Sequence, residues 1–417
     1  MISVGVLVDL MCREEAGGQV KCWERFAEEA GSLGGQLDLT LHFLGDENKN
    51  FSMSDNVHCV THPPVLGTTR FNSMEHIADH TDLAPFHPRL LSYLPRYDVI
   101  HTTDAFFAMA RTANHFTRRN GKPLVTSIHT DVPRYTKLYA NQIIGKLCRT
   151  SRARHLLLSK FHLDDACQAV MKWRFARYLK GCDWILVSKT EDFDWVGRTL
   201  PGKGISFLRR GINKDLFHPR WRNRDRLERV LGIPKDRFLL LFVGRVDNGK
   251  NVMLLTEAAR LLLEQGEPIH VLMVGDGADS KAVQRLLGPS VTFTGIIPQS
   301  RLPWLYASSD LFVFPSEIEV HPNVVLEAKS SGLPVLVSAK GGAAQHVRNP
   351  GVDGFVLEEG SPHLWARLVK TLRSDSDYRT RVGIEARNGI DTHGPSWREV
   401  LVDDLLPVWK RVANGSE

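Results

Sequence analysis

Short apolar runs alternate with amphipathic segments along most of the chain, as strands and helices do when they follow one another in a parallel sheet. Strands that helices cover on both faces are continuous hydrophobic runs. We expect strands within residues 3–10, 37–44, 57–60, 98–101, 123–129, 181–188, 238–242, 269–274, 291–298, 311–314, 335–338 and 356–359. Helical spacing of apolar residues is found within 20–31, 302–309 and 397–412. The sequence therefore predicts an α/β fold.

The stretch 310–347 contains the most informative of these patterns. Its apolar run 311–314 is closed by a proline and predicts a buried strand. Asn323 is a good N-cap, so we expect a helix over 324–331, which a glycine and a proline then end. The next apolar run, 335–338, predicts a second buried strand. The stretch is thus a strand–loop–helix–strand unit.

Two glutamates in this unit are candidates for binding chemistry. Glu319 lies in the predicted loop and Glu327 lies inside the predicted helix. A helix N-terminus beyond the carboxyl end of a strand is where α/β sheets bind anionic ligands. A carboxylate such as Glu327 can accept hydrogen bonds from two vicinal hydroxyls, as on a ribose. The same spacing would also suit two solvated surface carboxylates, so both interpretations stay open on spacing alone.

The spacing of these glutamates is also the pattern of a known family. Glu319 and Glu327 with seven residues between them, followed by Ala328 and the segment 332–335, resemble the E-x7-E signature of retaining GT-B glycosyltransferases of family 4. The resemblance covers most of the chain, most firmly residues 205–360. It implies two Rossmann-like domains facing a cleft. It also implies transfer of a sugar from a nucleotide-sugar donor, UDP-sugar favoured, to an acceptor hydroxyl with retention.

Two cations follow the strand expected at 238–242. Arg245 and Lys250 lie in a strand-to-helix loop, where two cations can hold a diphosphate. Exposed cations in a loop are often only solvated, but the resemblance to the family's G-R-x-x-x-x-K segment favours diphosphate binding. The resemblance gives both residues a catalytic role, stabilising charge on the leaving nucleotide.

The resemblance supplies the other expected donor contacts. Pro322 stands where the family often has glycine, and it has no N–H, so amides of Asn323 and Val324 would contact the sugar. Ile297 follows the strand that begins at residue 291 and is the candidate beside the base. Glu319 would lie beside the transferred sugar and belong to the catalytic set.

Further candidates lie in the first half of the chain. The glycine pair Gly17–Gly18 follows the first strand, where the family's loop faces the donor phosphates and the acceptor; a plain flexible turn is the alternative. His129 ends a strand and matches the family's histidine near the donor sugar, so it joins the expected catalytic residues. For His101, which ends the preceding strand, a structural role is expected.

Length and a linker motif divide the chain. At 417 residues two domains are expected. The segment 211–219 resembles the family's interdomain linker. We therefore expect an N-terminal acceptor-side domain over 1–205, a C-terminal nucleotide-sugar-binding domain over 206–393, and a helix over 394–417 that returns to the first domain.

Composition excludes several classes of protein. Hydrophobic residues make up 42 % and charged residues 24 %, the balance of a globular protein, and no apolar stretch approaches the ~20 residues of a membrane span. The N-terminus lacks a basic region and predicts a strand, not a signal peptide. A net charge of +6 is too small to indicate nucleic acid. The cysteines show no metal-type pairs, and no D-x-D motif can be placed in the site. We expect no metal, no cofactor and a cytoplasmic location.

A basic segment suggests the acceptor. Residues 146–180 contain nine Lys or Arg against two Asp, interleaved with large apolar residues. Core-packed helices with a solvated basic face would explain this; the alternative is a surface for anionic lipid headgroups on the inner face of the membrane. The segment 129–135 resembles the H-T-x-x-P-x-Y of diacylglycerol glycosyltransferases. Diacylglycerol or another membrane lipid is thus one acceptor, and a soluble or polysaccharide acceptor is another. A nucleotide-sugar epimerase and a non-catalytic sugar- or lipid-binding module remain alternatives.

Overall fold

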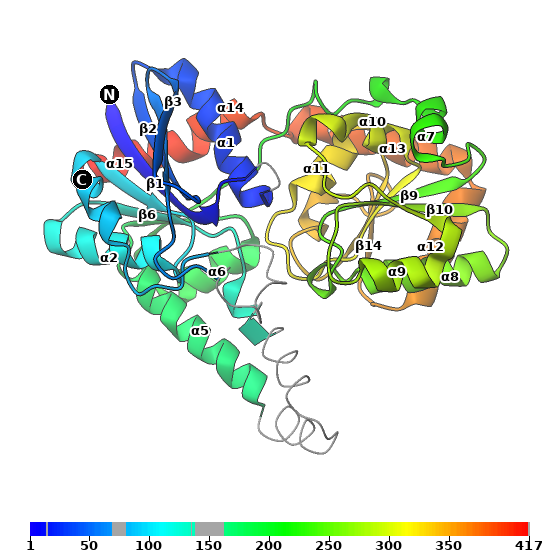
Figure 1. The fold of residues 1–417 in the computed structure, drawn as a ribbon, viewed down its shortest axis with the longest axis horizontal. Coiled ribbons are helices and arrows are strands. Elements are labelled where there is room, and N and C mark those ends of the chain that lie inside the picture. Colours follow the sequence, from blue (N-terminus) through cyan, green and yellow to red (C-terminus); the bar gives the residue numbers. More distant parts are fainter. Residues whose placement is uncertain (14–15, 69–80, 135, 138–161, 416–417) are drawn as a thin grey trace. The chain divides into compact units, whose positions relative to one another are not determined.

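The computed structural model describes residues 1–13, 16–68, 81–134, 136–137 and 162–415. Its chain forms two compact units, of which unit 1 comprises Met1–Arg209 with Arg398–Glu417 and unit 2 comprises Arg210–Trp397 (Figure 1). The boundaries between the units, after Arg209 and after Trp397, therefore lie slightly later in the chain than the expected boundaries after residues 205 and 393. The C-terminal segment belongs to unit 1.

Unit 1 is built on one sheet of eight strands among the described residues, in the order β3-β4-β2-β1-β5-β6-β7-β8. All neighbouring strands are parallel except the antiparallel pair β3 and β4. The strands are β1 Ile2–Met11, β2 Leu37–Leu44, β3 Lys49–Ser54, β4 Val57–His62, β5 Val99–Thr102, β6 Leu124–Ser127, β7 Trp184–Val187 and β8 Gly204–Phe207. The central β1 and β2 are almost wholly buried, which explains their continuous apolar runs.

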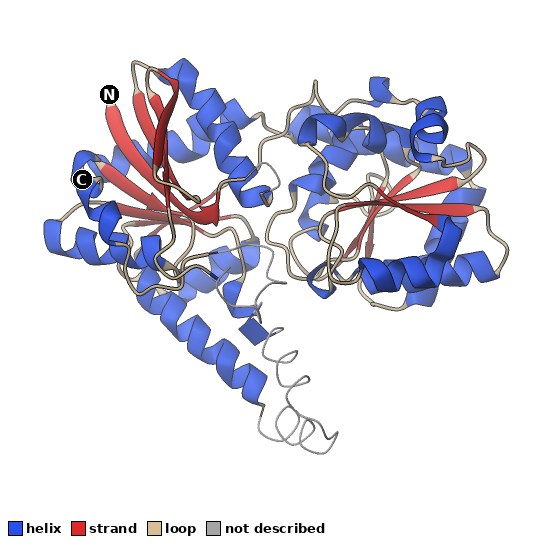
Figure 2. Ribbon diagram, viewed as in Figure 1, coloured by secondary structure: helices blue, strands red, loops and turns tan. Residues whose placement is uncertain are grey.

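Helices lie on both faces of this sheet (Figure 2). The described ones are α1 Gly18–Ala30, α2 Ala108–Asn120, α5 Leu163–Leu179, α6 Thr190–Thr199, α14 Trp397–Val400 and α15 Leu406–Ala413. A π-helical turn, Leu401–Leu405, joins the last two. The α15 helix packs against β1 and β5. Asp404 also ties the C-terminal segment to Arg209 within the unit, because it accepts four hydrogen bonds of 2.7 to 3.1 Å from the side chain and backbone of Arg209.

Unit 2 has a six-stranded, wholly parallel sheet in the order β11-β10-β9-β12-β13-β14. Its strands are β9 Phe238–Val243, β10 Ile269–Val274, β11 Val291–Phe293, β12 Leu311–Phe314, β13 Val335–Ser338 and β14 Phe355–Leu357. Its helices are α7 Arg224–Leu231, α8 Val252–Glu264, α9 Ser280–Leu287, α10 Pro303–Ser308, α11 Asn323–Ser330, α12 Pro362–Ser374 and α13 Ser376–His393. Every residue of β9, β10, β12 and β13 is buried.

The two expected Rossmann-like units of parallel sheet are confirmed. In unit 2 the chain leaves β9 toward β10 on one side, and leaves β12 toward β13 on the other. The order of strands therefore reverses between β9 and β12. Ligands of open α/β sheets bind outside the carboxyl ends of the strands at such a reversal.

The structure corrects the expected start of α11. The helix begins at Asn323, and Pro322 takes the N-cap position with φ −75° and ψ 113° and without a side-chain capping bond. Proline is tolerated at this position because the N–H that it lacks would take no part in the hydrogen bonds within the helix. Asn323 is thus the first helical residue instead of the cap.

A buried ion pair fixes α11 to the end of the sheet in unit 2. Lys329 and Asp353 are 2 % and 5 % exposed, and Lys329 Nζ lies 2.7 Å from Asp353 Oδ2. The same ammonium donates to the carbonyl of His346 at 2.6 Å. Burial lowers the pKa of Lys329, and Asp353 opposes that shift. The pair therefore holds the helix that carries Glu327.

We expect Lys329→Met to lower the free energy of unfolding by about 3–5 kcal/mol, because it leaves Asp353 buried without its cation. Urea denaturation of the parent and the variant measures this loss. The control is Lys235→Met, which removes an exposed lysine paired with Asp225 at 2.6 Å. Equal stability of the parent and both variants would contradict a supporting role for the buried pair.

Candidate functional site

Two loops meet at the carboxyl ends of β9 and β12 in unit 2. The first follows β9 and ends in a 3-10 turn, Asn248–Lys250, before α8; the second connects β12 to α11. Ser316 Oγ donates to the carbonyl of Gly249 at 3.3 Å, and Asn251 Nδ2 donates to that of Pro315 at 3.5 Å. Neighbouring strands and these two bonds bring the predicted cation loop and the predicted glutamate loop together.

Lys250 and Glu319 form an ion pair across these loops. Their side chains are 13 % and 22 % exposed, so solvent screens the pair less than it would a surface pair. The contact joins the candidate diphosphate cation to the carboxylate expected beside the sugar. Lys250 is thereby held at the end of β12 instead of extending into solvent.

Arg245 is held in the same loop by Asp247. Its Nε donates to Asp247 Oδ2 at 3.0 Å, and the other carboxylate oxygen accepts from the backbone N of Lys250 at 3.1 Å. The Arg245 side chain is 26 % exposed. Asp247 therefore fixes both the guanidinium and the backbone that carries Lys250. Sequence analysis did not single out Asp247, although its place two residues after Arg245 was a usable signal.

A glycine pair closes the floor of the glutamate loop. Gly341 has φ +91°, and a Cβ on it would lie 2.7 Å from the carbonyl oxygen of Glu317. A Cβ on Gly342 would lie 1.7 Å from the carbonyl oxygen of Val320. The backbone N of Gly342 donates to Glu319 O at 2.6 Å. Only glycine permits this approach, which sets the path of the loop around Glu319.

Glu327 is buried in α11 and is already held by two donors. Gln299 Nε2 donates to Glu327 Oε1 at 2.7 Å, and Tyr306 Oη donates to Oε2 at 2.9 Å. Burial and the neighbouring carboxylate raise the pKa of Tyr306, so its phenol stays protonated and donates. Each carboxylate oxygen has a further lone pair for another donor. Sequence analysis did not identify Gln299 and Tyr306 as partners of Glu327, because they lie 28 and 21 residues before it in the chain.

The other predicted residues of unit 2 lie around the same loops or further along the sheet edge. Pro322, Asn323 and Val324 form the start of α11, and Asn323 Oδ1 is buried without a hydrogen-bond partner among the described residues. Ile297 follows the edge strand β11 and packs, half-buried, against the core of unit 2. The structure thus groups Arg245, Lys250 and Glu319, with α11 beside them.

The predicted residues of unit 1 lie at strand and helix ends of its own sheet. Gly17 is the N-cap of α1 at φ −63°, and a Cβ on Gly18 would contact nothing within 4 Å, so the protein fold itself does not demand glycine there. His129 follows β6 and is 9 % exposed. Its Nε2 lies 2.8 Å from Ser127 Oγ. His101, expected to be structural, lies 2.9 Å from the same hydroxyl.

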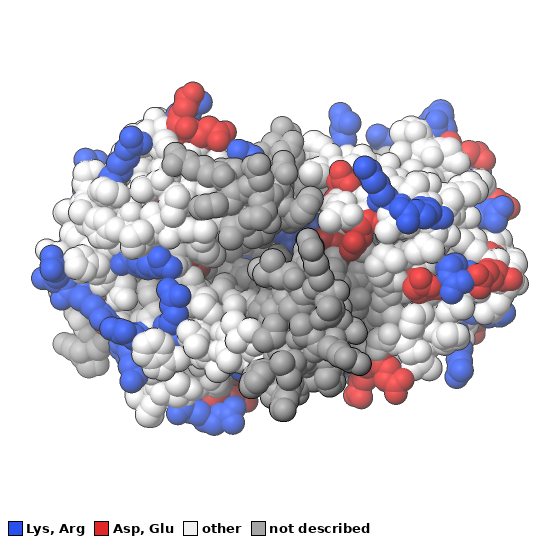
Figure 3. Space-filling model, turned by 60° about the horizontal axis from the view of Figure 1, so that its bottom comes forward, with Lys and Arg blue, Asp and Glu red and all other residues white. Residues whose placement is uncertain are grey.

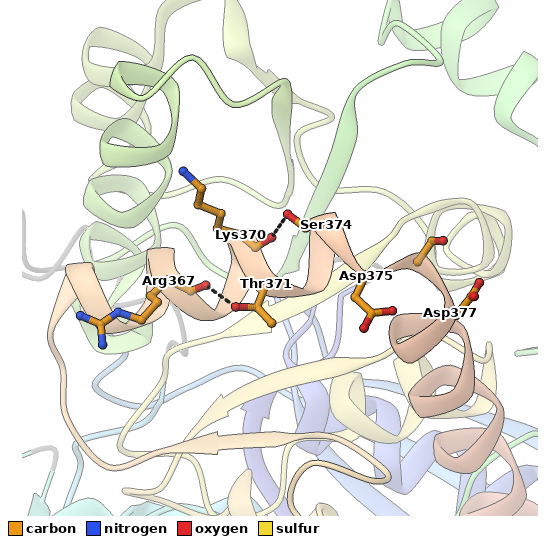
Figure 4. A pocket seen from close by; sticks show the side chains of 7 residues that line it. Arg367, Lys370, Thr371, Ser374, Asp375 and Asp377 are labelled. Atoms are coloured by element: carbon orange, nitrogen blue, oxygen red, sulfur yellow. Dashed lines mark hydrogen bonds between the residues drawn. The ribbon is translucent and has the colours of Figure 1, made fainter.

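The described residues contain no group of three or more His, Cys, Asp or Glu placed to hold a metal ion. Nor do they include a helix long and apolar enough to cross a membrane. A hollow of about 660 Å³ lies over α12 and the start of α13 (Figure 4). Two of its hydroxyls are engaged within their own helix: Thr371 and Ser374 donate to the carbonyls of Arg367 and Lys370. It is a surface depression away from the two loops.

Comparison with known proteins gives a family for much of unit 2. Residues 223–389 match the model described as glycosyl transferases group 1. A sulfoquinovosyl transferase of Arabidopsis thaliana is 28 % identical over 320 residues, which cover 75 % of this chain and 56 % of that protein. A D-inositol 3-phosphate glycosyltransferase of Catenulispora acidiphila is 32 % identical over 221 residues, 49 % of this chain and 51 % of the relative. The chain thus spans about half the length of these curated relatives.

The fold has solved counterparts. A sucrose-phosphate synthase from Thermosynechococcus elongatus matches over 100 % of both chains with a TM-score of 0.73 and 17 % identity. At that identity the likeness concerns the fold alone. It agrees with the GT-B class expected from the sequence.

We expect Glu327→Ala to lower the free energy of unfolding by about 1–3 kcal/mol, because the buried Tyr306 hydroxyl loses its acceptor. The double variant Glu327→Ala/Tyr306→Phe should regain part of this loss, since it removes donor and acceptor together. Urea unfolding of both single variants and the double variant completes the cycle. Strictly additive losses would show that the hydrogen bond between the two side chains contributes nothing.

Proposed function

Since residues 223–389 match the family of glycosyl transferases group 1, we propose that the chain is a retaining hexosyltransferase. It moves a sugar from a nucleotide-sugar donor, UDP-sugar favoured, to an acceptor hydroxyl. The names of the Arabidopsis and Catenulispora relatives support sugar transfer as the reaction class. The acceptor we favour is a membrane lipid such as diacylglycerol.

The observation that carries this proposal is the placement of Lys250, Arg245 and Glu319 at one point of the unit 2 sheet. Two cations and a carboxylate lie where the strand order reverses, at the carboxyl ends of β9 and β12. A nucleotide sugar has a diphosphate beside a neutral, hydroxyl-rich ring. The cations match the first part and the carboxylate matches the second.

The same residues define the chemistry that we propose. Breaking the glycosidic bond to the nucleotide leaves negative charge on the diphosphate, and Arg245 with Lys250 stabilises it as it forms. This is why we propose transfer without a metal ion. Glu319 is neutralised by Lys250 and is therefore a poor nucleophile, so we favour front-side displacement in an ion-pair-like state over a covalent intermediate. Glu319 would instead accept hydrogen bonds from the sugar.

We expect transfer from a nucleotide sugar to a component of a cell lipid extract, with unchanged turnover in EDTA. A thermal-shift panel of nucleotide sugars selects the donor, and product analysis then gives the acceptor and the anomeric configuration. Turnover lost in EDTA and restored only by magnesium or manganese would refute the role given to the cations. Product formed without any acceptor would indicate an epimerase, and donor binding without turnover would indicate a non-catalytic module.

Two variants separate the roles of the glutamates in this assay. Glu319→Ala should lower kcat about tenfold to a hundredfold, because the lost contact involves a charged acceptor beside the sugar. Glu327→Ala should mainly raise the KM for the donor, by about tenfold, if its remaining lone pairs bind the ribose. Tyr306→Phe is the matched control, since it disturbs the same carboxylate without removing it. An unchanged donor KM in Glu327→Ala would contradict the ribose contact.

Helix α5 supports the lipid acceptor. It has exposed apolar side chains at Leu163, Val170 and Trp173, which are 41 %, 56 % and 61 % exposed. The spacing of these residues places them on one side of the helix. In Figure 1, α5 extends away from the sheet of unit 1, and its buried residues are Asp164 in the first turn and Tyr178 and Leu179 at the C-terminal end. The described part of 146–180 therefore has two sides: Met171 and Phe175 pack against the core of unit 1, and Leu163, Val170 and Trp173 are exposed.

Basic residues flank this apolar side. Lys172, Arg174, Arg177 and Lys180 are exposed, and the Arg177 guanidinium lies 5.7 Å from the centroid of the Trp173 ring. In Figure 3, Lys and Arg predominate on the face of unit 1 that is in view. Each basic residue near an anionic bilayer contributes about 1 kcal/mol, and apolar side chains add insertion energy. The combination fits reversible binding to anionic lipid.

We expect the parent protein to sediment with anionic vesicles at low salt and to be released at high salt. The variant Lys172→Glu/Arg174→Glu/Arg177→Glu should stay in the supernatant while donor hydrolysis is kept. A control of equal charge change, Lys281→Glu/Arg285→Glu/Arg381→Glu, alters exposed residues of α9 and α13 in unit 2. A companion variant reverses Arg149, Arg152, Arg154 and Lys160, which lie outside the described residues. Sedimentation of the α5 variant with vesicles, or none by the parent, would favour a soluble acceptor.

A further inference from the structure

A chain of four buried side chains connects the C-terminal helix to His129 within unit 1. Trp409 Nε1 on α15 donates to His101 Nδ1 at 3.0 Å. His101 Nε2 lies 2.9 Å from Ser127 Oγ, and Ser127 Oγ lies 2.8 Å from His129 Nε2. Trp409 and His101 are fully buried, and Ser127 is 1 % exposed. The three hydrogen bonds of this chain are therefore shielded from solvent.

The first link fixes the tautomer of His101. An indole N–H can only donate, so His101 Nδ1 must accept and carries no proton. Burial lowers the pKa of His101 to about 3, so the ring is neutral near pH 7. A neutral imidazole has one N–H, which must then be at Nε2. His101 Nε2 therefore donates to Ser127 Oγ.

The hydrogen bond between Ser127 and His129 has a defined donor as well. Ser127 Oγ accepts from His101 and has a single proton of its own to donate. Within the described part of the chain, the other partner of this hydroxyl is His129 Nε2. A buried hydroxyl proton without an acceptor costs about 1–3 kcal/mol, so the serine donates to His129. A neutral His129 then carries its own proton on Nδ1.

We propose that Trp409, His101 and Ser127 are positioning residues that hold His129 in its Nδ1–H tautomer. This inference rests on the proposed function, in which His129 contacts the sugar or its leaving phosphate. With Nε2 occupied as an acceptor, His129 does not act as a base through that nitrogen, and its ring proton lies on Nδ1. Sugar hydroxyls and phosphates present oxygen acceptors that such a donor suits.

Aromatic packing holds the rings of His101 and His129 in place. The Trp23 ring lies edge-on to His101, with centroids 5.0 Å apart at 85°, and also contacts His129 at 6.1 Å. Trp409 contacts His101 from its own helix at 5.8 Å. The imidazole of His101 therefore has an indole against it from α1 and from α15, but only the latter donates to its ring nitrogen. This difference provides a matched control.

Nitrogen-15 spectra of histidine side chains distinguish the two tautomers, and the full-length protein labelled only at histidine tests the inference. We expect Nε2–H at His101 and Nδ1–H at His129 in the parent. Trp409→Phe removes the donor, so both histidines should become tautomer mixtures. Ser127→Ala should free His129 while leaving His101 as Nε2–H. Trp23→Phe makes the same change of ring against the same imidazole and should leave both tautomers as in the parent. His101→Gln and His129→Gln assign the signals.

Turnover provides the second measurement. In Trp409→Phe, kcat should fall in proportion to the fraction of His129 that leaves the Nδ1–H form, while the donor KM stays close to that of the parent. An Nε2–H signal for His129 in the parent, or tautomers unaffected by Trp409→Phe, would overturn the proposal. Should Trp409→Phe fail to fold, Ser127→Ala alone decides the last link. The spectra do not depend on turnover, so a protein without transferase activity would refute the function and leave the network itself tested.

Discussion

The adjacency of β9 and β12 is the constraint on which the organisation of unit 2 depends. Both strands are buried parallel strands, and their connections leave toward opposite sides of the sheet. The loops that follow them must therefore emerge next to one another, free of a crossing helix. Every feature of the candidate site in this unit follows from that point, including the ion pair of Lys250 with Glu319 and the position of α11. The charges are consequences of the topology, since neither loop alone would bring a cation to a carboxylate.

Much of the sheet could be predicted from the sequence, because hydrophobic runs covered on both faces leave an unambiguous signal. The runs at 269–274, 311–314 and 335–338 coincide with β10, β12 and β13. The strand β3 was missed, because almost all of its residues are exposed and its side chains show no burial pattern. Pairing with β4 makes it a strand, and pairing is not visible in a local window.

The candidate site could be predicted only in part. Residue types and spacing indicated Arg245, Lys250, Glu319 and Glu327 as candidates, and the structure brings the first three together at one point. What spacing could not supply is which side chains orient them. Glu327 is held by a glutamine and a tyrosine from other elements, and His129 by a serine that itself receives a bond from a second histidine. Such contacts depend on tertiary packing of distant segments, which leaves no periodic trace in the sequence.

The division of the chain also sets an order of assembly during synthesis. Unit 2, residues 210–397, is an insertion between the two parts of unit 1. A ribosome therefore releases all of unit 2 before it releases α15, and unit 2 can fold while unit 1 still lacks α15. Trp409 is synthesised after all of unit 2, and its indole completes the buried contacts of His101. The nascent protein can thus acquire a folded unit 2 first, and the histidine network of unit 1 is completed only when α15 docks.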